Sequence, residues 1–306
     1  MRSSGTLMCL ASGIGFGAMA VFGKLSYDEG ATVGTLLVVR FGLAAVLFWL
    51  LLAARGAVGE VRTLGRRDLG LGLALGAAGY ALQAGGYFAA LERIDASLLA
   101  LILYTYPAMV AGAALAIGRE RLDGRKVAAL LLASSGLVLV LAGAGAGALD
   151  PVGAALGLGA AMIYTTYILV SERVVARVRP PVLSAVVCTG ASASLLVGTT
   201  LLGEFRPGDL TAAGWGWLAC LAVISTVGAV SLFFAGLDRV GPTAASILST
   251  IEPVVTVLLA FLVFGEVLGA VQLAGGALVL AAVLVLNLRW DRRLRAREEA
   301  IGSAPA

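Results

Sequence analysis

Polar side chains recur at helical spacing inside stretches of this chain that are otherwise apolar. Tyr80, Gln83 and Tyr87 are spaced i, i+3 and i+7, which places them on one face of a helix. A tyrosine offers a flat apolar ring and a hydroxyl, so such a face suits a small molecule with an apolar side chain and a polar head group. The candidate binding residues are Tyr80, Gln83, Tyr87, Tyr104, Tyr164, Tyr167, Ser246, Ser249 and Thr250.

Charged residues also lie inside the apolar stretches. Glu252 is about ten residues from the start of its helix, hence about 15 Å deep by helix rise and close to the centre of a bilayer. A carboxylate there must be paired, hydrated or protonated. It could carry a proton, contact a substrate ammonium, or form a structural pair with Lys24 or Arg40. Lys24 and Arg40 could each receive a substrate carboxylate; a structural ion pair or, for Lys24, extension to the headgroups is the alternative.

These residues also have purely structural interpretations. Tyrosines near helix ends anchor helices at the membrane interface, which applies above all to Tyr104. Serines and threonines form hydrogen bonds between membrane helices. Pro107 and Pro253 lie inside apolar stretches, where the missing amide hydrogen bond predicts a kink. Such kinks could act as gates or could be static.

The elements that carry these residues are predicted from composition. Sixty per cent of the 306 residues are hydrophobic and 13 per cent are charged, and the mean hydropathy is +0.99. Apolar stretches of about 20 residues can cross a hydrocarbon core as helices. We therefore predict an all-α integral membrane protein with ten transmembrane helices. The predicted spans are 5–28, 32–54, 68–91, 95–118, 124–143, 151–172, 181–203, 211–237, 241–264 and 268–289.

The sequence also contains an internal repeat. The run from Phe88 to Leu132 recurs without a gap from Phe234 to Leu278, always 146 residues later. Each copy has five predicted helices, an odd number, so the two copies must be inverted relative to each other. The predicted units are a first five-helix repeat at 1–143, a second at 151–289 and a basic cytoplasmic tail at 290–306.

The distribution of positive charge predicts the topology. With a cytoplasmic N-terminus, 18 of the 22 Lys and Arg residues fall on the cytoplasmic side, against Arg93 and Arg206 outside. The positive-inside rule therefore places both termini in the cytoplasm. This topology explains the formal charge of +4, and we expect no nucleic acid partner.

Several classes of function are disfavoured. The chain has no His, the commonest general base and metal ligand, and no acidic pair at depth replaces it. It has no Gly-Lys-Ser/Thr phosphate-binding motif, so ATP is not the expected energy source. We expect no catalytic residues, no metal and no cofactor, and the protein is not expected to be an enzyme.

A set of residues in the predicted helices follows a known pattern. The set is Gly15, Phe16, Gly17 and Lys24 in the first helix, Arg40 and Phe41 in the second, Pro107 with Glu120, and Pro253 with Glu266. It resembles the pattern of the EamA-type transporters of the drug/metabolite transporter superfamily, and the resemblance covers residues 5 to 289. The tryptophan common in that family's first helix is absent, and Val186 stands where an equivalent of Arg40 would map.

The resemblance implies a secondary active or facilitative transporter that exports small metabolites by alternating access across a bacterial inner membrane. Within the family, the chain looks most like exporters of aromatic and other neutral amino acids. The expected partners are a small-molecule substrate and membrane lipid; proton coupling stays open, and a monomer is compatible with the sequence. Alternatives are efflux of drugs or hydrophobic cations and, more remotely, a non-transport membrane scaffold or an intramembrane enzyme.

Overall fold

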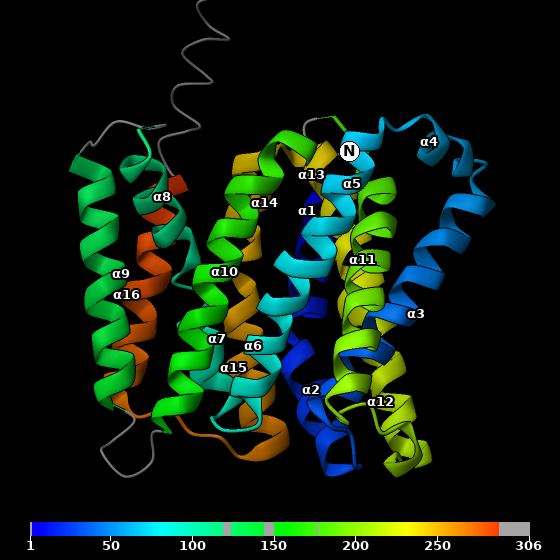
Figure 1. Cartoon of the computed structure of the whole chain (residues 1–306). Coiled ribbons are helices and arrows are strands. Elements are labelled where there is room, and N and C mark those ends of the chain that lie inside the picture. Colours follow the sequence, from blue (N-terminus) through cyan, green and yellow to red (C-terminus); the bar gives the residue numbers. More distant parts are fainter. Residues whose placement is uncertain (1, 119–123, 144–149, 176, 288–306) are drawn as a thin grey trace, which may run out of the picture.

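A computed structural model describes residues 2–118, 124–143, 150–175 and 177–287, and every regular element in these ranges is a helix. The long helices stand side by side in one bundle (Figure 1). We call the face at which α1 begins the N-terminal face, and the other the opposite face. The first half contains α1 (Arg2–Gly17), α2 (Met19–Asp28), α3 (Val33–Ala54), α4 (Val58–Thr63), α5 (Arg66–Ala74), η1 (Leu75–Tyr80), α6 (Ala81–Leu91), α7 (Ala96–Leu103), α8 (Tyr106–Ala116) and α9 (Gly124–Gly143).

The second half repeats this order from α10 onward. A short 3-10 turn, η2, precedes its third long helix. The elements are α10 (Pro151–Val175), α11 (Pro180–Leu201), η2 (Pro207–Asp209), α12 (Ala212–Ala222), η3 (Val223–Gly228), α13 (Ala229–Val240), α14 (Pro242–Ser249), α15 (Ile251–Phe264) and α16 (Ala270–Asn287).

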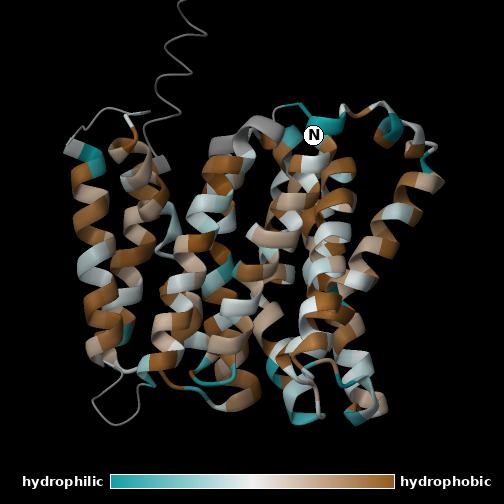
Figure 2. Cartoon of the chain, in the orientation of Figure 1, coloured by the Kyte–Doolittle hydropathy of each residue, from teal (hydrophilic) through white to brown (hydrophobic). Residues whose placement is uncertain are grey.

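The outer surface of the bundle is apolar. Leu131, Val138 and Leu262 are each more than half exposed, and hydrophobic residues run along the middle of the helices in Figure 2. Within the described residues, eight helices are long and apolar enough to cross a membrane. The protein is therefore a multi-pass membrane protein. The other two predicted spans also contain helices: α5, η1 and α6 together occupy 68–91, and α16 occupies 270–287 of the span predicted at 268–289.

Three of the long helices are interrupted. The first breaks at Ala18, between α1 and α2, and the others break at Tyr104 and Thr105, between α7 and α8, and at Thr250, between α14 and α15. The last two breaks are 146 residues apart, so they are equivalent in the two repeats. Each lies just before one of the two prolines predicted to mark kinks.

Two π-helical turns occupy corresponding helices of the two halves. η1 joins α5 to α6, and η3 joins α12 to α13. A π-helical turn widens the helix locally and is frequently found at functional sites. Neither turn was predicted from the sequence.

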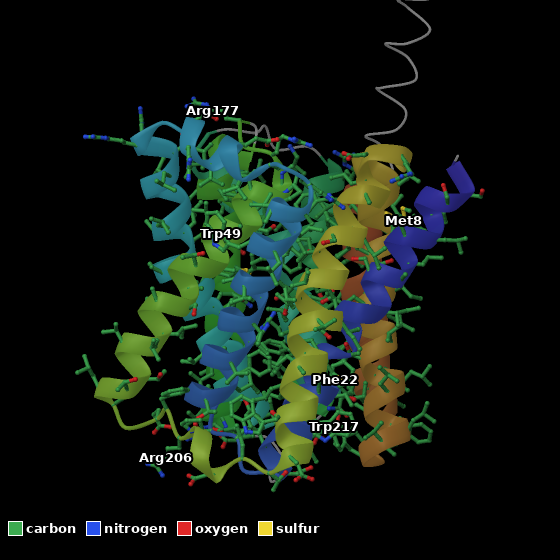
Figure 3. The ribbon with its side chains drawn as sticks, turned by 90° about the vertical axis from the view of Figure 1, so that its right-hand side faces the viewer. Met8, Phe22, Trp49, Arg177, Arg206 and Trp217 are labelled. Carbon is green, nitrogen blue, oxygen red and sulfur yellow. The ribbon has the colours of Figure 1, made fainter. Side chains whose placement is uncertain are left out.

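Close helix contacts hold the two halves together. A Cβ on Gly17 would lie 2.8 Å from the backbone oxygen of Glu252, so a glycine is needed where α1 meets α15. The hydroxyl of Thr256 donates to the Gly17 carbonyl at 3.0 Å in the same contact. On another side of the bundle, Trp49 Nε1 donates to Thr189 Oγ1 at 3.0 Å and ties α3 to α11 (Figure 3).

Candidate functional site

The bundle encloses a cavity of about 1480 Å³ between its two halves. At the N-terminal face it is lined by Arg125 and Lys126, in the first turn of α9, and by Leu286 near the end of α16. Its described lining residues include none from the connections at the opposite face, 29–32, 92–95, 202–211 and 265–269. The cavity therefore extends to the N-terminal face and stops short of the opposite one.

Most of the residues singled out in the sequence meet at this cavity. Thr250 does not line it and instead donates to the Ile247 carbonyl at 2.7 Å. Pro253 is buried in α15, and Lys24 lies at the opposite face. The predicted residues that line the cavity are Arg40, Tyr80, Gln83, Tyr87, Tyr104, Pro107, Tyr164, Tyr167, Ser246, Ser249 and Glu252.

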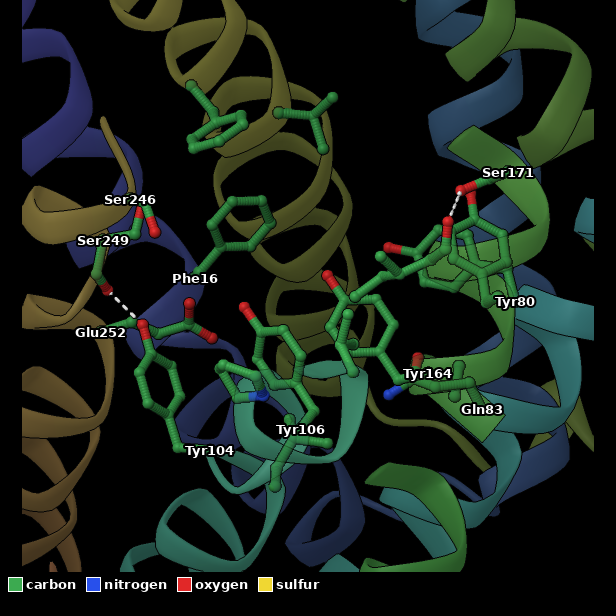
Figure 4. A pocket seen from close by; sticks show the side chains of 18 of the residues that line it. Phe16, Tyr80, Gln83, Tyr104, Tyr106, Tyr164, Ser171, Ser246, Ser249 and Glu252 are labelled. Carbon is green, nitrogen blue, oxygen red and sulfur yellow. Dashed lines mark hydrogen bonds between the residues drawn. The ribbon is translucent and has the colours of Figure 1, made fainter. Parts of the chain in front are cut away.

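Five tyrosines form a continuous row along the cavity wall, which we call the tyrosine row: Tyr104, Tyr106, Tyr164, Tyr167 and Tyr80. All of them except Tyr167 are labelled in Figure 4. In that order, successive ring centroids are 5.8, 4.6, 6.2 and 5.9 Å apart. These separations lie in the range of favourable aromatic contacts. The row offers flat apolar surface and a succession of hydroxyl groups.

Glu252 lies at one end of the tyrosine row (Figure 4). Figure 4 shows its carboxylate beside Tyr104 and Tyr106. The Tyr104 hydroxyl itself donates to the Ser249 carbonyl at 2.6 Å. In the described part of the chain, no Lys or Arg lies within 4.0 Å of Glu252. The structural pair with Lys24 or Arg40, one of the alternatives from the sequence, is absent.

Arg40 lies at the other end of the row. It is 2% exposed, and its Nε donates to Thr226 Oγ1 at 3.0 Å while Nη2 donates to the Tyr80 hydroxyl at 3.5 Å. The guanidinium carbon lies 5.0 Å from the ring centroid of Phe41 and 5.4 Å from that of Phe88. Aromatic faces stabilise this buried cation. Among the described residues, no carboxylate lies within 4.0 Å of it.

Lys24 forms an ion pair at the opposite face. Its Nζ lies 2.6 Å from Glu266 Oε1. Burial raises the pKa of Glu266, but hydrogen bonds from Lys24 and Ser97 outweigh burial and hold the pKa below its ordinary value. The structural alternative for Lys24 therefore matches this geometry better than substrate contact or extension to the headgroups.

Several lining residues were not among the candidates. Phe16, Tyr106, Cys188 and Thr226 all line the cavity. The repeat offset would have found two of them, since Tyr106 is equivalent to Glu252 and Thr226 to Tyr80. Glu120 and the predicted tail at 290–306 lie outside the described residues.

Comparison with known proteins gives a consistent picture. A model of the EamA-like transporter family matches residues 3–142 and again residues 151–288, so its domain is duplicated in this chain. The uncharacterized transporter YcbK of Bacillus subtilis is 27% identical over 280 residues, which cover 89% of each chain. An uncharacterized transporter of Archaeoglobus fulgidus is 29% identical over 281 residues, which cover 92% of this chain and 95% of the other.

The fold also matches a solved structure. A crystal structure that is 21% identical in sequence superposes with a TM-score of 0.67, covering 96% of this chain and 99% of the other. At this identity the likeness shows the fold alone.

Proposed function

Since the chain belongs to the EamA-like transporter family, whose members are membrane transporters, we propose that it carries small zwitterionic metabolites, most specifically aromatic or other neutral amino acids. In this proposal the substrate binds in the cavity with its carboxylate at Arg40, its ammonium at Glu252 and its side chain against the tyrosine row.

One observation carries the proposal: Arg40 and Glu252 line the same cavity, and neither of them has an ion-pair partner among the described residues. A buried charge without a counter-charge is costly. A zwitterion supplies a counter-charge to each, and an aromatic side chain gains contact with the rings between them. The site would also reject ligands that leave one charge unpaired.

The transport cycle follows from the repeat. We propose ten membrane-crossing helices in two inverted five-helix repeats, with both termini in the cytoplasm of a bacterial inner membrane. The N-terminal face is then cytoplasmic. The conformation in which the cavity extends to this face is the one that loads substrate from inside the cell. Export follows when the repeats rearrange, close this face and open the opposite one. Pro107 and Pro253, beside equivalent helix breaks, are the proposed hinges.

Glu252 also favours a second candidate, efflux of hydrophobic cations. A carboxylate beside tyrosine rings suits a cationic amine without a carboxylate. The two candidates differ at Arg40, because a cationic drug gains nothing from a buried guanidinium.

Counterflow in proteoliposomes separates the candidates. Vesicles with the purified protein are loaded with unlabelled L-phenylalanine, and uptake of labelled L-phenylalanine is measured against three competitors: L-tyrosine, phenethylamine, which lacks the carboxylate, and 3-phenylpropionate, which lacks the amine. We expect uptake well above that of empty vesicles, with strong inhibition by tyrosine and weak inhibition by the other two. Uptake no higher than in empty vesicles would contradict the amino-acid assignment, and stronger inhibition by phenethylamine than by tyrosine would favour cation efflux.

A further inference from the structure

Arg40 lies between two π-helical turns, one from each repeat. Thr226, which accepts from its Nε, belongs to η3, and Tyr80, which accepts from Nη2, ends η1. Adding the 146-residue offset to position 80 gives position 226, so the two partners are equivalent. Arg40 has no such counterpart, because its equivalent is Val186. Equivalent elements of both repeats therefore hold one cation.

The Thr226 hydroxyl can act towards Arg40 only as an acceptor. It donates its single hydrogen to the Leu221 carbonyl at 3.0 Å, five residues earlier. Its oxygen is then left to accept the Nε hydrogen of Arg40. Thr226 is 1% exposed, so bulk water does not compete for this contact. The widened turn of η3 thus fixes the orientation of the hydroxyl, and the hydroxyl fixes the guanidinium.

This contact selects the edge of Arg40 that a ligand can use. A guanidinium binds a carboxylate bidentately, through either the edge formed by Nε and one Nη or the edge formed by both Nη groups. Thr226 occupies Nε, which removes the edge that includes Nε. Nη2 donates one of its two hydrogens to Tyr80 and keeps the other for the edge that it forms with Nη1. Arg40 lines the cavity, so this edge is the one left for a ligand.

We propose that Thr226 is the positioning residue for the substrate carboxylate: it holds Arg40 so that the two Nη groups bind the carboxylate at the junction of the repeats. The inference rests on the proposed function and deepens it, because it assigns recognition of the carboxylate to an element of the second repeat acting on a residue of the first. Thr226 acts on the carboxylate through Arg40.

The test compares two substitutions at Thr226 with a matched control beside it. Thr226→Val keeps the shape and removes the hydroxyl, and Thr226→Ser keeps the hydroxyl. Ser225→Ala is the control, because the Ser225 hydroxyl lies buried in the same π-helical turn and has no hydrogen-bond partner among the described residues. In counterflow, we expect Thr226→Val to raise the half-saturating concentration of L-phenylalanine about tenfold and to leave inhibition by phenethylamine unchanged. Thr226→Ser and Ser225→Ala should stay within about twofold of wild type.

Two outcomes would overturn the inference. One is a Thr226→Val protein that transports like Thr226→Ser. The other is a Thr226→Val protein that weakens the carboxylated and the carboxyl-free ligand equally, as a general packing defect would.

A second measurement does not depend on transport. Phenylglyoxal modifies guanidinium groups, and mass spectrometry of the Arg40 peptide gives its labelling rate in purified protein. We expect Thr226→Val to raise this rate several-fold over wild type and Ser225→Ala. If the wild type exchanges no amino acid but the labelling pattern holds, the proposed function fails and the positioning of Arg40 stands. If the wild type exchanges phenylalanine but all variants label alike, the positioning fails and the function stands.

Discussion

Lys24 and Glu266 join the first repeat to the second at the opposite face, with 2.6 Å between Nζ and Oε1. The Glu266 carboxylate also accepts from the backbone N–H groups of Ala96 and Ser97, at 3.1 and 2.9 Å, and from the Ser97 hydroxyl at 2.8 Å. Its side chain is 6% exposed, whereas that of Asp95, 3.8 Å from Lys24, is 65% exposed. Glu266 is therefore the main partner of Lys24 and also caps the N-terminus of α7.

This ion pair should keep the opposite face closed. Cys188 lines the cavity, so in a Cys9→Ala/Cys220→Ala background it reports access from the opposite face, which the proposed topology places outside the cell. In intact cells treated with a membrane-impermeant thiol reagent, we expect Glu266→Gln to raise Cys188 labelling about tenfold, which corresponds to about 1.4 kcal/mol in the balance of closed and open states. Arg93→Gln is the matched control, because it breaks a more exposed ion pair with Asp150, 3.3 Å long, at the same face. Equal labelling in Glu266→Gln and wild type would mean that the pair does not close this face.

The ion pair between Lys24 and Glu266 should weaken only when the pH falls below the ordinary pKa of a glutamate. The pKa of Glu266 is lowered in the folded protein, so its stabilising contribution is complete above the ordinary Glu pKa of about 4.3. That contribution is lost as the pH falls through the lowered pKa. We expect the difference in melting temperature between wild type and Glu266→Gln to be constant from about pH 7 to 5 and to shrink below about pH 4. A difference that already shrinks near pH 6 would contradict this assignment.

Glu252→Gln should remove sensitivity to a proton gradient. The carboxylate lies in the cavity without a cationic partner among the described residues, so a proton or a substrate ammonium can neutralise it. An imposed gradient, acidic on the side of the opposite face, should accelerate phenylalanine flux towards that side through the wild type and leave the flux through Glu252→Gln unchanged. Asp209→Asn is the control, because Asp209 is an exposed carboxylate on the opposite face. Its flux should respond to the gradient as the flux of the wild type does. A Glu252→Gln protein with the full gradient response would exclude proton coupling through this residue.

Gly17→Ala should destabilise the contact between α1 and α15. The added Cβ would lie 2.8 Å from the backbone oxygen of Glu252 and from Val255, an overpacking that costs about 1–3 kcal/mol. Gly85→Ala provides the comparison, because a Cβ there meets nothing within 4 Å and alanine favours a helix over glycine by up to about 1 kcal/mol. Thermal unfolding in detergent should show a lower midpoint for Gly17→Ala and no loss for Gly85→Ala. Equal midpoints would contradict the close approach.

The sequence predicted the helices well, because each must present about 20 apolar residues to lipid. The predicted spans and the observed helices differ by only a few residues at their ends. Pro107 and Pro253 also marked the two equivalent helix breaks, since proline removes an amide donor. The break at Ala18 carries no such signal. The π-helical turns were not predicted either, because no residue type marks them and only the hydrogen-bond pattern of the folded helix shows them.

The candidate site was partly predictable. Helical phase selected Tyr80, Gln83 and Tyr164, and all three line the cavity. Depth selected Glu252 without revealing its surroundings, because pairing depends on which helices become neighbours. The ion pair of Lys24 could not be predicted for the same reason, since its partner Glu266 is 242 residues away in the sequence.

Counterflow by wild type, Arg40→Gln and Glu252→Gln tests whether the substrate binds between the two charges, with the half-saturating concentration of L-phenylalanine as the readout. We expect saturable exchange by the wild type and a half-saturating concentration at least about tenfold higher in each variant, because each substitution removes the counter-charge for one end of the zwitterion. Exchange by all three proteins with the same half-saturation would contradict the claim that the substrate binds between Arg40 and Glu252.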